Sequence, residues 1–413
     1  GNAALGAVDD VDLTAAVAGA LGAALRAAGV DVDLAPCADV NSGPANPVIG
    51  VRSFGSDADL VARHAAGFVA GLQAAGVAAC AKHFPGHGAV AVDSHLALPT
   101  VAAPAEVLRA RELAPFRAAV AAGVAAVMPG HLLVPALDPA AATVSRRILC
   151  DLLRGELGFA GVVVTDALDM GGAGGPIPAL VVQALAAGAD LCCLGPDNDD
   201  ALVTACVEAV VAAVAVGTLP EPRVHDAAAR VAALASAVGA EVGPPAADPW
   251  SRVAALGAEA ARRAVRVDGP LPAPVTGAHV VELDRPANVA AGVVPWGLAG
   301  PLARRDPTAT ATRVAEGDDR AVASALLAGR GRPLVVVCRD PARRPDQAAA
   351  LAALLAARPD ATLVDMGWPT SGLPPAAATI TTFGASPACG DAVAALLLGA
   401  AAPAADTGRT SRG

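Results

Sequence analysis

The chain has 413 residues, a formal charge of -10 at pH 7 and 54 % hydrophobic residues. That length predicts two domains, or one large domain with an appendage. The acidic balance argues against binding to nucleic acid or to anionic membranes, because both need clustered positive charge. Gly, Pro or charged residues interrupt the apolar stretches before they reach the roughly 20 residues of a bilayer span. We therefore expect a soluble globular protein without a membrane span.

Rare residue types narrow the function classes further. Aromatic residues make up only 2 % of the chain, so flat platforms for stacking bases are nearly absent. Lys82 is the single lysine among 29 basic residues, which draws attention to its segment. The eight cysteines form no CxxC pair, and their scatter predicts no metal, no cofactor and a reducing cytoplasm. Secretion stays open, because the chain starts abruptly and a leader could precede it.

Residues 1–239 alternate helix-like Ala, Leu and Arg segments with short apolar runs. Each run follows a helical stretch that stops at or near a glycine, as at Gly29 and Gly76. The repeated unit predicts parallel strands joined by crossover helices. Polar clusters follow the runs at the strands' carboxyl ends, the edge where α/β folds hold their sites. The five runs are Val30–Leu34, Gly76–Ala81, Gly123–Met128, Gly161–Thr165 and Ala189–Leu194.

The pattern breaks at residues 240–253, where a Pro-rich stretch indicates a linker. Residues 254–402 then alternate helix and strand again, with strand-like apolar runs at 279–283 and 333–338. They predict a second, smaller α/β domain that is poor in convergent polar groups. Residues 403–413 are predicted to be a disordered tail.

The densest polar cluster follows the second apolar run. It places Lys82 and three of the seven histidines within 14 residues, more cationic potential than a structural loop needs. Asp93 and His95 are two residues apart in an expected extended loop, so their side chains face the same way. A carboxylate in that position fixes the imidazole's tautomer and gives a proton donor and acceptor usable near pH 7. Metal ligation by His83, His87 and His95 is one alternative, and a surface loop without a role is another.

Asp166 follows the apolar run of residues 161–165, which places a carboxylate at the end of a core strand. Its side chain points either into a site or to a helix N-terminus as a cap. With the Asp93–His95 pair it supplies one nucleophile and one acid/base, the combination that cleaves glycosidic bonds by double displacement. Arg52 lies in a loop shaped by Pro and Gly, where its donor fork can hold a hydroxyl or acyl group. A solvated surface arginine is the commoner case.

Three motifs in this order resemble glycoside hydrolase family 3 and, within it, the β-N-acetylglucosaminidase (β-hexosaminidase) branch. The long second motif, with its Asp-Ser-His ending, is specific to that branch. The resemblance runs from about residue 15 to 239 and continues more faintly to about residue 400. The motifs are Pro47-Val48-Ile49-Gly50-Val51-Arg52-Ser53-Phe54, then Lys82-His83-Phe84-Pro85-Gly86-His87-Gly88 with Asp93-Ser94-His95, then Leu153-Arg154-Gly155-Glu156-Leu157-Gly158-Phe159 leading to Thr165-Asp166-Ala167-Leu168-Asp169-Met170.

The resemblance implies an α/β fold, a (β/α)8 TIM-type barrel followed by a smaller α/β sandwich domain. It implies a retaining, exo-acting enzyme that removes terminal β-linked N-acetylglucosamine from cell-wall-derived saccharides or muropeptides. The site residues that match the family are Asp166 as nucleophile, His95 as acid/base, Asp93 as its orienting partner, and Arg52, Lys82 and His83 as sugar-binding residues.

One departure from the family concerns the start of the chain. Family members begin with a strand that ends in an Asp-x-Glu-Gly-Gly type motif, which this sequence lacks. We therefore expect an N-terminally truncated barrel without its first strand over residues 1–239. The alternatives are a phosphorylase, since a histidine acid/base does not repel incoming phosphate, a β-glucosidase of the same family, and a sugar-binding protein that has lost catalysis.

Overall fold

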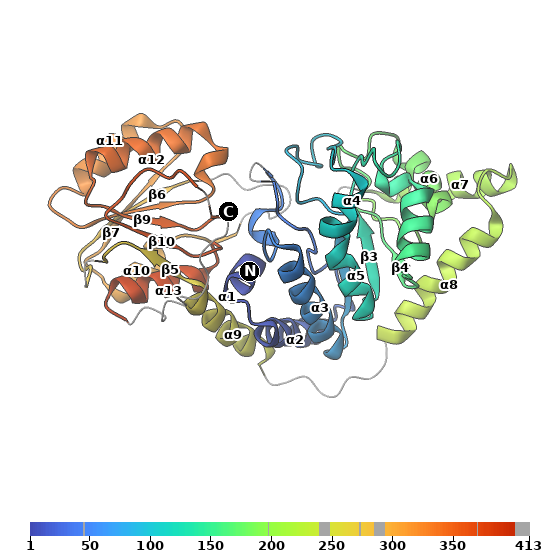
Figure 1. The fold of residues 1–413 in the computed structure, drawn as a ribbon, viewed down its shortest axis with the longest axis horizontal. Coiled ribbons are helices and arrows are strands. Elements are labelled where there is room, and N and C mark those ends of the chain that lie inside the picture. Colours follow the sequence, from blue (N-terminus) through green and yellow to red (C-terminus); the bar gives the residue numbers. More distant parts are fainter. Residues whose placement is uncertain are drawn as a thin grey trace. The chain divides into compact units, whose positions relative to one another are not determined.

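The computed structural model shows two compact units, residues 9–253 and residues 1–8 with 254–413 (Figure 1). None of the described helices is long and apolar enough to cross a membrane. Residues 240–247 of the predicted linker and the predicted tail 403–413 lie outside the described residues. The structure describes residues 1–43, 46–196, 198–238, 248–271, 274–284, 294–369 and 371–400.

The larger unit contains a parallel sheet, as the repeated helix–Gly–strand units predict. Its strands lie in the order β1-β2-β3-β4, and every neighbouring pair is parallel. Leu191, in the fifth predicted run, makes only a bridge to Val164 beyond β4. The strands are β1 (Val32–Asp33), β2 (Ala78–Phe84), β3 (Ala126–Pro129) and β4 (Val162–Val163).

Helix α2 (Val11–Ala27), which precedes β1, illustrates how the helices of this unit begin and end. The side chain of Asp10 accepts a hydrogen bond from the Leu13 N–H at the first turn. The chain leaves the helix through Gly29, whose φ of 81° favours glycine. The other helical elements are η1 (Gly50–Arg52), α3 (Ala58–Ala74), α4 (Ala105–Val107), η2 (Leu108–Glu112), α5 (Leu113–Ala121), η3 (Ala142–Val144), η4 (Arg147–Glu156), α6 (Ile177–Ala187), α7 (Asp200–Ala215) and α8 (Glu221–Val238).

Strand β2 carries the polar cluster at its carboxyl end. Its first four residues are fully buried, as expected for a central parallel strand with both faces covered. The register with β3 then shifts between Lys82 and Phe84. Such an irregularity re-aims side chains, and it occurs where the strand changes from apolar to polar residues.

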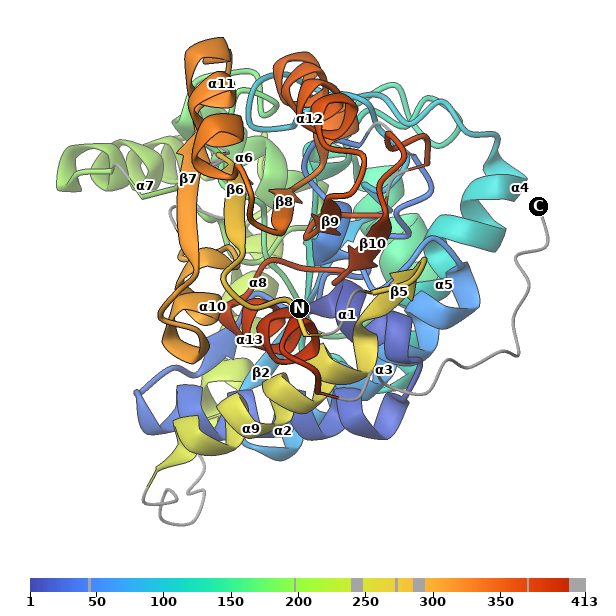
Figure 2. The same cartoon turned by 90° about the vertical axis from the view of Figure 1, so that its left-hand side faces the viewer.

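The smaller unit contains a six-stranded sheet with helices on both faces. The strand order is β5-β10-β9-β8-β6-β7, with β5 antiparallel to β10 (Figure 2). Helices α11 and α12 pack on one face, and α9, α10 and α13 pack on the other (Figure 1). The elements are α1 (Asn2–Val8), α9 (Pro249–Ala264), β5 (Arg266–Asp268), β6 (His279–Leu283), α10 (Ala299–Arg305), β7 (Thr310–Val314), α11 (Asp319–Ala328), β8 (Leu334–Cys338), η5 (Pro341–Arg343), α12 (Pro345–Ala357), β9 (Thr362–Asp365), β10 (Ala378–Thr381) and α13 (Pro387–Leu397).

The strand-like runs at 279–283 and 333–338 form β6 and β8. Helix α9 begins at Pro249, so its first turn occupies residues that the Pro-rich pattern assigned to the linker. Local chemistry explains this start. Proline is tolerated in the first turn of a helix, and the carboxylate of Asp248 accepts a hydrogen bond from the Ser251 N–H at 3.2 Å.

Candidate active site

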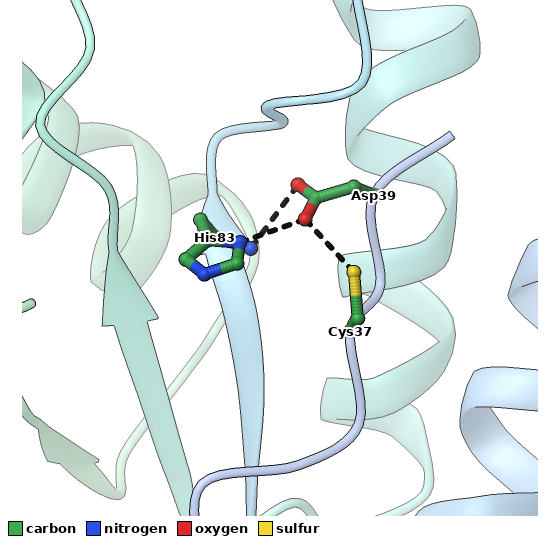
Figure 3. Close-up of side chains that lie close together, drawn as sticks. All are labelled: Cys37, Asp39 and His83. Carbon is green, nitrogen blue, oxygen red and sulfur yellow. Dashed lines mark hydrogen bonds and ion pairs between the residues drawn. The ribbon is translucent and has the colours of Figure 1, made fainter. Parts of the chain in front are cut away.

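A fully buried carboxylate, Asp39, lies in the segment that follows β1 and faces the carboxyl end of β2 (Figure 3). Its Oδ1 accepts hydrogen bonds from the backbone N–H groups of His83 (3.1 Å) and His87 (2.7 Å). Its Oδ2 accepts from the His83 ring Nδ1 (2.8 Å) and from the Cys37 thiol (3.0 Å). Burial alone would raise the pKa of Asp39, but its attraction to His83 and these hydrogen bonds lower it to about 2. Asp39 is therefore ionised and holds His83 in place.

His83 presents its Nε2 lone pair next to Arg52. Because Nδ1–H donates to the ionised Asp39, Nε2 is left as an acceptor. The Arg52 Nη2 lies 3.5 Å from this atom, and the Arg52 Nη1 donates to the Val48 carbonyl at 3.3 Å. Burial lowers the pKa of His83, although the neighbouring Asp39 acts in the opposite direction, and this favours the neutral ring. Two of the predicted sugar-binding residues, Arg52 and His83, thus lie side by side.

Asp166 lies in the loop that follows β4, half-buried, and no described helix begins nearby. Its Oδ1 accepts a hydrogen bond from the Ala167 N–H at 2.9 Å, so it does not cap a following helix. Burial alone would raise the pKa of Asp166. Attraction to His83 and His131, and then the Ala167 bond and the charge of Lys82, lower that pKa instead. The structure therefore brings the predicted nucleophile within the electrostatic reach of Lys82 and His83 and keeps it ionised.

His95 and Asp93 form the expected pair, but they do so in a turn rather than in an extended loop, because the Leu96 and Ala97 N–H groups donate to the Asp93 carbonyl. The His95 Nδ1 lies 2.7 Å from the Asp93 Oδ1, which also accepts a hydrogen bond from the His95 backbone N–H at 2.9 Å. The side chains are 18 % and 22 % exposed, so both remain within reach of a bound molecule. Asp93 fixes the Nδ1–H tautomer and leaves Nε2 as the atom that can give or take a proton.

His87 links the β2 motif to the loop that carries His95. Its Nε2 lies 2.9 Å from the Oγ of Ser94, and burial lowers its pKa to about 4. The three histidines considered as metal ligands thus contact three different partners: His83 contacts Asp39, His87 contacts Ser94 and His95 contacts Asp93. They do not converge on one point.

Among the described residues, the one group of three possible metal ligands is Cys37, Asp39 and His83, whose donor atoms lie within 4.8 Å (Figure 3). The thiol and the imidazole both donate to Asp39, so the group is satisfied by its own hydrogen bonds. Burial, and then the charge of Asp39, raise the pKa of the Cys37 thiol well above its usual range. Only the thiolate is a good metal ligand, so these contacts favour a structural role.

Sequence reasoning gave no role to Asp39 or to His131. The His131 Nε2 lies 2.9 Å from the Ala167 carbonyl, and its Nδ1 lies 2.8 Å from the Thr143 Oγ1. Because a carbonyl only accepts, Nε2 carries the proton and fixes the peptide that follows Asp166. His131 is a polar residue three positions after the apolar run that ends at Met128, so its place near the carboxyl end of β3 was a usable signal.

The family model described as "Glycosyl hydrolase family 3 N terminal domain" matches residues 1–234, more than half of the chain. Beta-hexosaminidases from Stenotrophomonas maltophilia (strain R551-3) and Pseudomonas aeruginosa (strain LESB58) are each 43 % identical over 169 residues, 40 % of this chain and 50 % of the relative. The chain thus spans about half the length of the curated relatives it matches.

Solved structures extend the similarity to both units. A glycoside hydrolase family 3 beta-N-acetylglucosaminidase from Paenibacillus sp. str. FPU-7 is 35 % identical, with a TM-score of 0.87. The match covers 97 % of this chain and 80 % of that one. The beta-glucoside phosphorylase BglX, at 17 % identity and a TM-score of 0.78 over 97 % of this chain and 78 % of its own, shares the fold alone. The predicted fold class, an α/β barrel-type unit followed by a smaller α/β unit, is confirmed.

Proposed function

The chain belongs to glycosyl hydrolase family 3, and on that premise we propose that it is a retaining, exo-acting β-N-acetylglucosaminidase. Its substrates are saccharides or muropeptides derived from cell walls, with a terminal β-linked N-acetylglucosamine. The observation that carries the proposal is the contact of 2.7 Å between the His95 Nδ1 and the Asp93 Oδ1. Most glycosidases use a second carboxylic acid at this point, whereas the amino-sugar branch that the sequence resembles uses a histidine.

In the first step the Asp166 carboxylate attacks the anomeric carbon while the His95 imidazolium donates its Nε2 proton to the leaving oxygen. The glycosidic C–O bond breaks, a glycosyl ester forms on Asp166, and the aglycone leaves as a neutral alcohol. The lowered pKa of Asp166 supports this role, because it keeps the nucleophile ionised.

In the second step the neutral His95 takes a proton from water through Nε2, and the water oxygen attacks the anomeric carbon. The ester bond breaks, Asp166 is released as a carboxylate, and the sugar keeps its β configuration after two inversions. Asp93 holds the Nδ1–H tautomer through both steps, so the same ring atom donates and accepts the proton.

The cationic and acceptor groups beside Asp166 suit a sugar ring. The guanidinium of Arg52 and the Nε2 lone pair of His83 lie next to each other and can bind hydroxyl groups from one side. Lys82 adds a positive charge that acts on Asp166. For the compartment we propose the cytoplasm, since all eight cysteines are free.

Covalent trapping tests the nucleophile directly. After incubation with a fluorinated N-acetylglucosaminyl fluoride, the intact mass should rise by one glycosyl unit, and peptide sequencing should find the label on Asp166. Asp166→Asn should remain unlabelled and lose at least about 10³-fold in kcat. Asp169→Asn is the matched control, because it changes an exposed carboxylate of the same segment, and it should label like the wild type.

Three results would contradict the proposal. A label on a residue other than Asp166 would remove the assigned nucleophile. A rate that depends on inorganic phosphate, with sugar phosphate as the product, would replace hydrolysis by phosphorolysis. Binding without turnover, unchanged in Asp166→Asn, would indicate a sugar-binding protein instead.

A further inference from the structure

The loop that carries Asp93 and His95 is hydrogen-bonded to a pair of glycines in the segment that begins with Asp166. The Gly171 N–H donates to the His95 carbonyl at 3.1 Å, and the Gly172 N–H donates to the Ser94 carbonyl at 3.0 Å. Two consecutive residues of one loop thus bind two consecutive residues of the other. The position of His95 is therefore tied to the segment of the predicted nucleophile.

Neither glycine has room for a side chain. A Cβ on Gly172 would lie 2.6 Å from the Ser94 carbonyl oxygen and 3.2 Å from the His131 Cβ. A Cβ on Gly171 would lie 2.7 Å from the Leu96 carbonyl oxygen. The shortest contact at each glycine is to a backbone oxygen, so no change of rotamer relieves the overlap.

The backbone conformation does not itself require glycine at either position. Gly171 and Gly172 are absent from the positive-φ residues of the chain, which include Gly174 with a φ of 73°. An alanine could therefore adopt the same backbone angles without strain. Glycine is needed here because the loop of residues 93–97 approaches so closely.

The same loop is bound from its other side by the β2 motif. The Ser94 Oγ lies 2.9 Å from the His87 Nε2, and the His87 backbone N–H donates to the buried Asp39. Ser94 is only 2 % exposed. The loop is thus bound between His87 and the glycine pair, while the His95 side chain stays partly exposed.

We propose that Gly171 and Gly172 are positioning residues that dock the loop of residues 93–97 and hold the His95 Nε2 where it protonates the leaving oxygen. This inference rests on the proposed function and deepens it. Holding a catalytic group in place supplies a large part of the rate in such reactions, and a displacement of about 1 Å costs roughly 10²-fold. The docking contact therefore controls acid/base catalysis without touching the substrate.

Leaving-group dependence distinguishes loss of the acid from general damage. For Gly172→Ala, kcat/KM on chitobiose should fall about 10²-fold, because its alkoxide leaving group needs a proton. On a dinitrophenyl β-N-acetylglucosaminide, whose leaving group needs no proton, kcat/KM should stay within about threefold of the wild type. Azide should raise the kcat of the variant on this substrate, because azide attacks the intermediate without giving up a proton. It should not raise the wild-type kcat.

Gly175→Ala is the matched control. It lies in the same segment, and its Cβ would come no closer than 3.6 Å to another atom, the Cδ2 of Leu180. It should behave like the wild type on both substrates. Gly171→Ala should reproduce the pattern of Gly172→Ala and serves in its place if that variant does not fold. An equal loss on both substrates, or no loss on either, would overturn the proposal.

Hydrogen exchange measures the docking without any catalysis. Amides of residues 89–99 should exchange faster in Gly172→Ala than in the wild type or Gly175→Ala, while β2 and β3 stay unchanged. If the wild type cleaves neither substrate, the proposed function fails, and the exchange data still decide whether the glycine pair docks the loop. Unchanged exchange in Gly172→Ala would reject the docking even in an active enzyme.

Discussion

Among single residues, Asp39 is a site residue that holds His83 in place, although sequence reasoning gave it no role. It receives two backbone N–H groups, one imidazole N–H and one thiol, all while fully buried. Four donors around one carboxylate stabilise the ionised form strongly. Asp39 also affects the proposed sugar-binding residues, because the tautomer of His83 depends on this carboxylate.

Asp39→Asn should therefore impair both sugar binding and stability. The amide can still accept from the two backbone N–H groups, but its NH2 group then faces the His83 ring and the Cys37 thiol. His83 must turn to the Nε2–H tautomer, which directs a donor at the Arg52 Nη2, 3.5 Å away. We expect KM to rise at least about tenfold and the free energy of unfolding to fall by about 2 to 3 kcal/mol.

Steady-state kinetics and urea unfolding measure the two effects of Asp39→Asn. Cys37→Ala is the control, since it removes one neutral donor and should leave KM unchanged. The pKa of Asp39 is about 2 in the folded state, against an ordinary value of 3.8. Its stabilisation is thus complete above pH 3.8 and is lost as the pH falls toward 2. An Asn variant with wild-type KM, or with the same acid-induced loss, would contradict this role.

The contact between site residues close in sequence was predicted, whereas the contacts between residues distant in sequence were not. The Asp93–His95 pair is an i, i+2 contact, and a local turn brings its members together, with the His95 N–H donating to the Asp93 Oδ1. The contact between Asp39 and His83 spans 44 residues and depends on the pairing of β1 with β2. The docking of His95 on Gly171 likewise needs the whole fold, and nothing in the local sequence shows it.

At the scale of elements, continuous apolar runs predicted strands well where neighbours pair on both sides. Strands β2, β6 and β8 formed at their predicted places. The first run gave only the two residues of β1, and the fifth gave a single bridge at Leu191. At the ends of a sheet, the neighbouring strand rather than the apolar run sets how many residues pair. The sequence alone therefore did not predict how short these two elements are.

A buried carboxylate also holds elements of the larger unit together. The Asp190 Oδ2 accepts from the Arg154 Nη2 of η4 (2.6 Å) and from the Val163 N–H of β4 (2.9 Å), while its Oδ1 accepts from Arg223 of α8. Asp190→Asn should leave the Arg154 guanidinium without this counter-charge and the Arg223 guanidinium with only the exposed Asp226, and both arginine side chains are 16 % exposed. We expect the free energy of unfolding to fall by about 3 kcal/mol in urea titrations.

Asp226→Asn provides the comparison for Asp190, because it pairs with the same Arg223 but its side chain is 47 % exposed. Its effect should remain below about 1 kcal/mol. Equal losses in the two variants would show that burial of the Asp190 network contributes nothing beyond an ordinary surface ion pair.

At the scale of the whole molecule, each described hydrophobic cluster draws its residues from one unit. Two clusters lie on the two faces of the six-stranded sheet, and two others lie within residues 80–234. A substitution that destabilises the core of one unit should therefore change hydrogen exchange mainly within that unit. The smaller unit offers a titratable group for such a measurement, because Asp365 is buried at the end of β9.

Asp365 should make the smaller unit less stable as the pH rises. Burial is the main cause that raises its pKa, to about 7, and Asp340 adds to this against the Gly367 N–H bond of 2.9 Å. The folded state thus holds a proton that the unfolded chain, at its ordinary 3.8, releases, so stability falls as the pH rises from 3.8 through 7. Asp365→Asn keeps the acceptor for Gly367 and removes the titration. The advantage of this variant over the wild type in the free energy of unfolding should grow by about 2 to 3 kcal/mol between pH 5 and pH 8.

Hydrogen exchange measured at both pH values should locate that growth in β8 and β9, with the smallest change in residues 9–238. Asp360→Asn, at an exposed carboxylate whose pKa is lowered by Arg358, should show no such growth. An Asp365→Asn advantage that is the same at both pH values would mean that Asp365 does not titrate in this range.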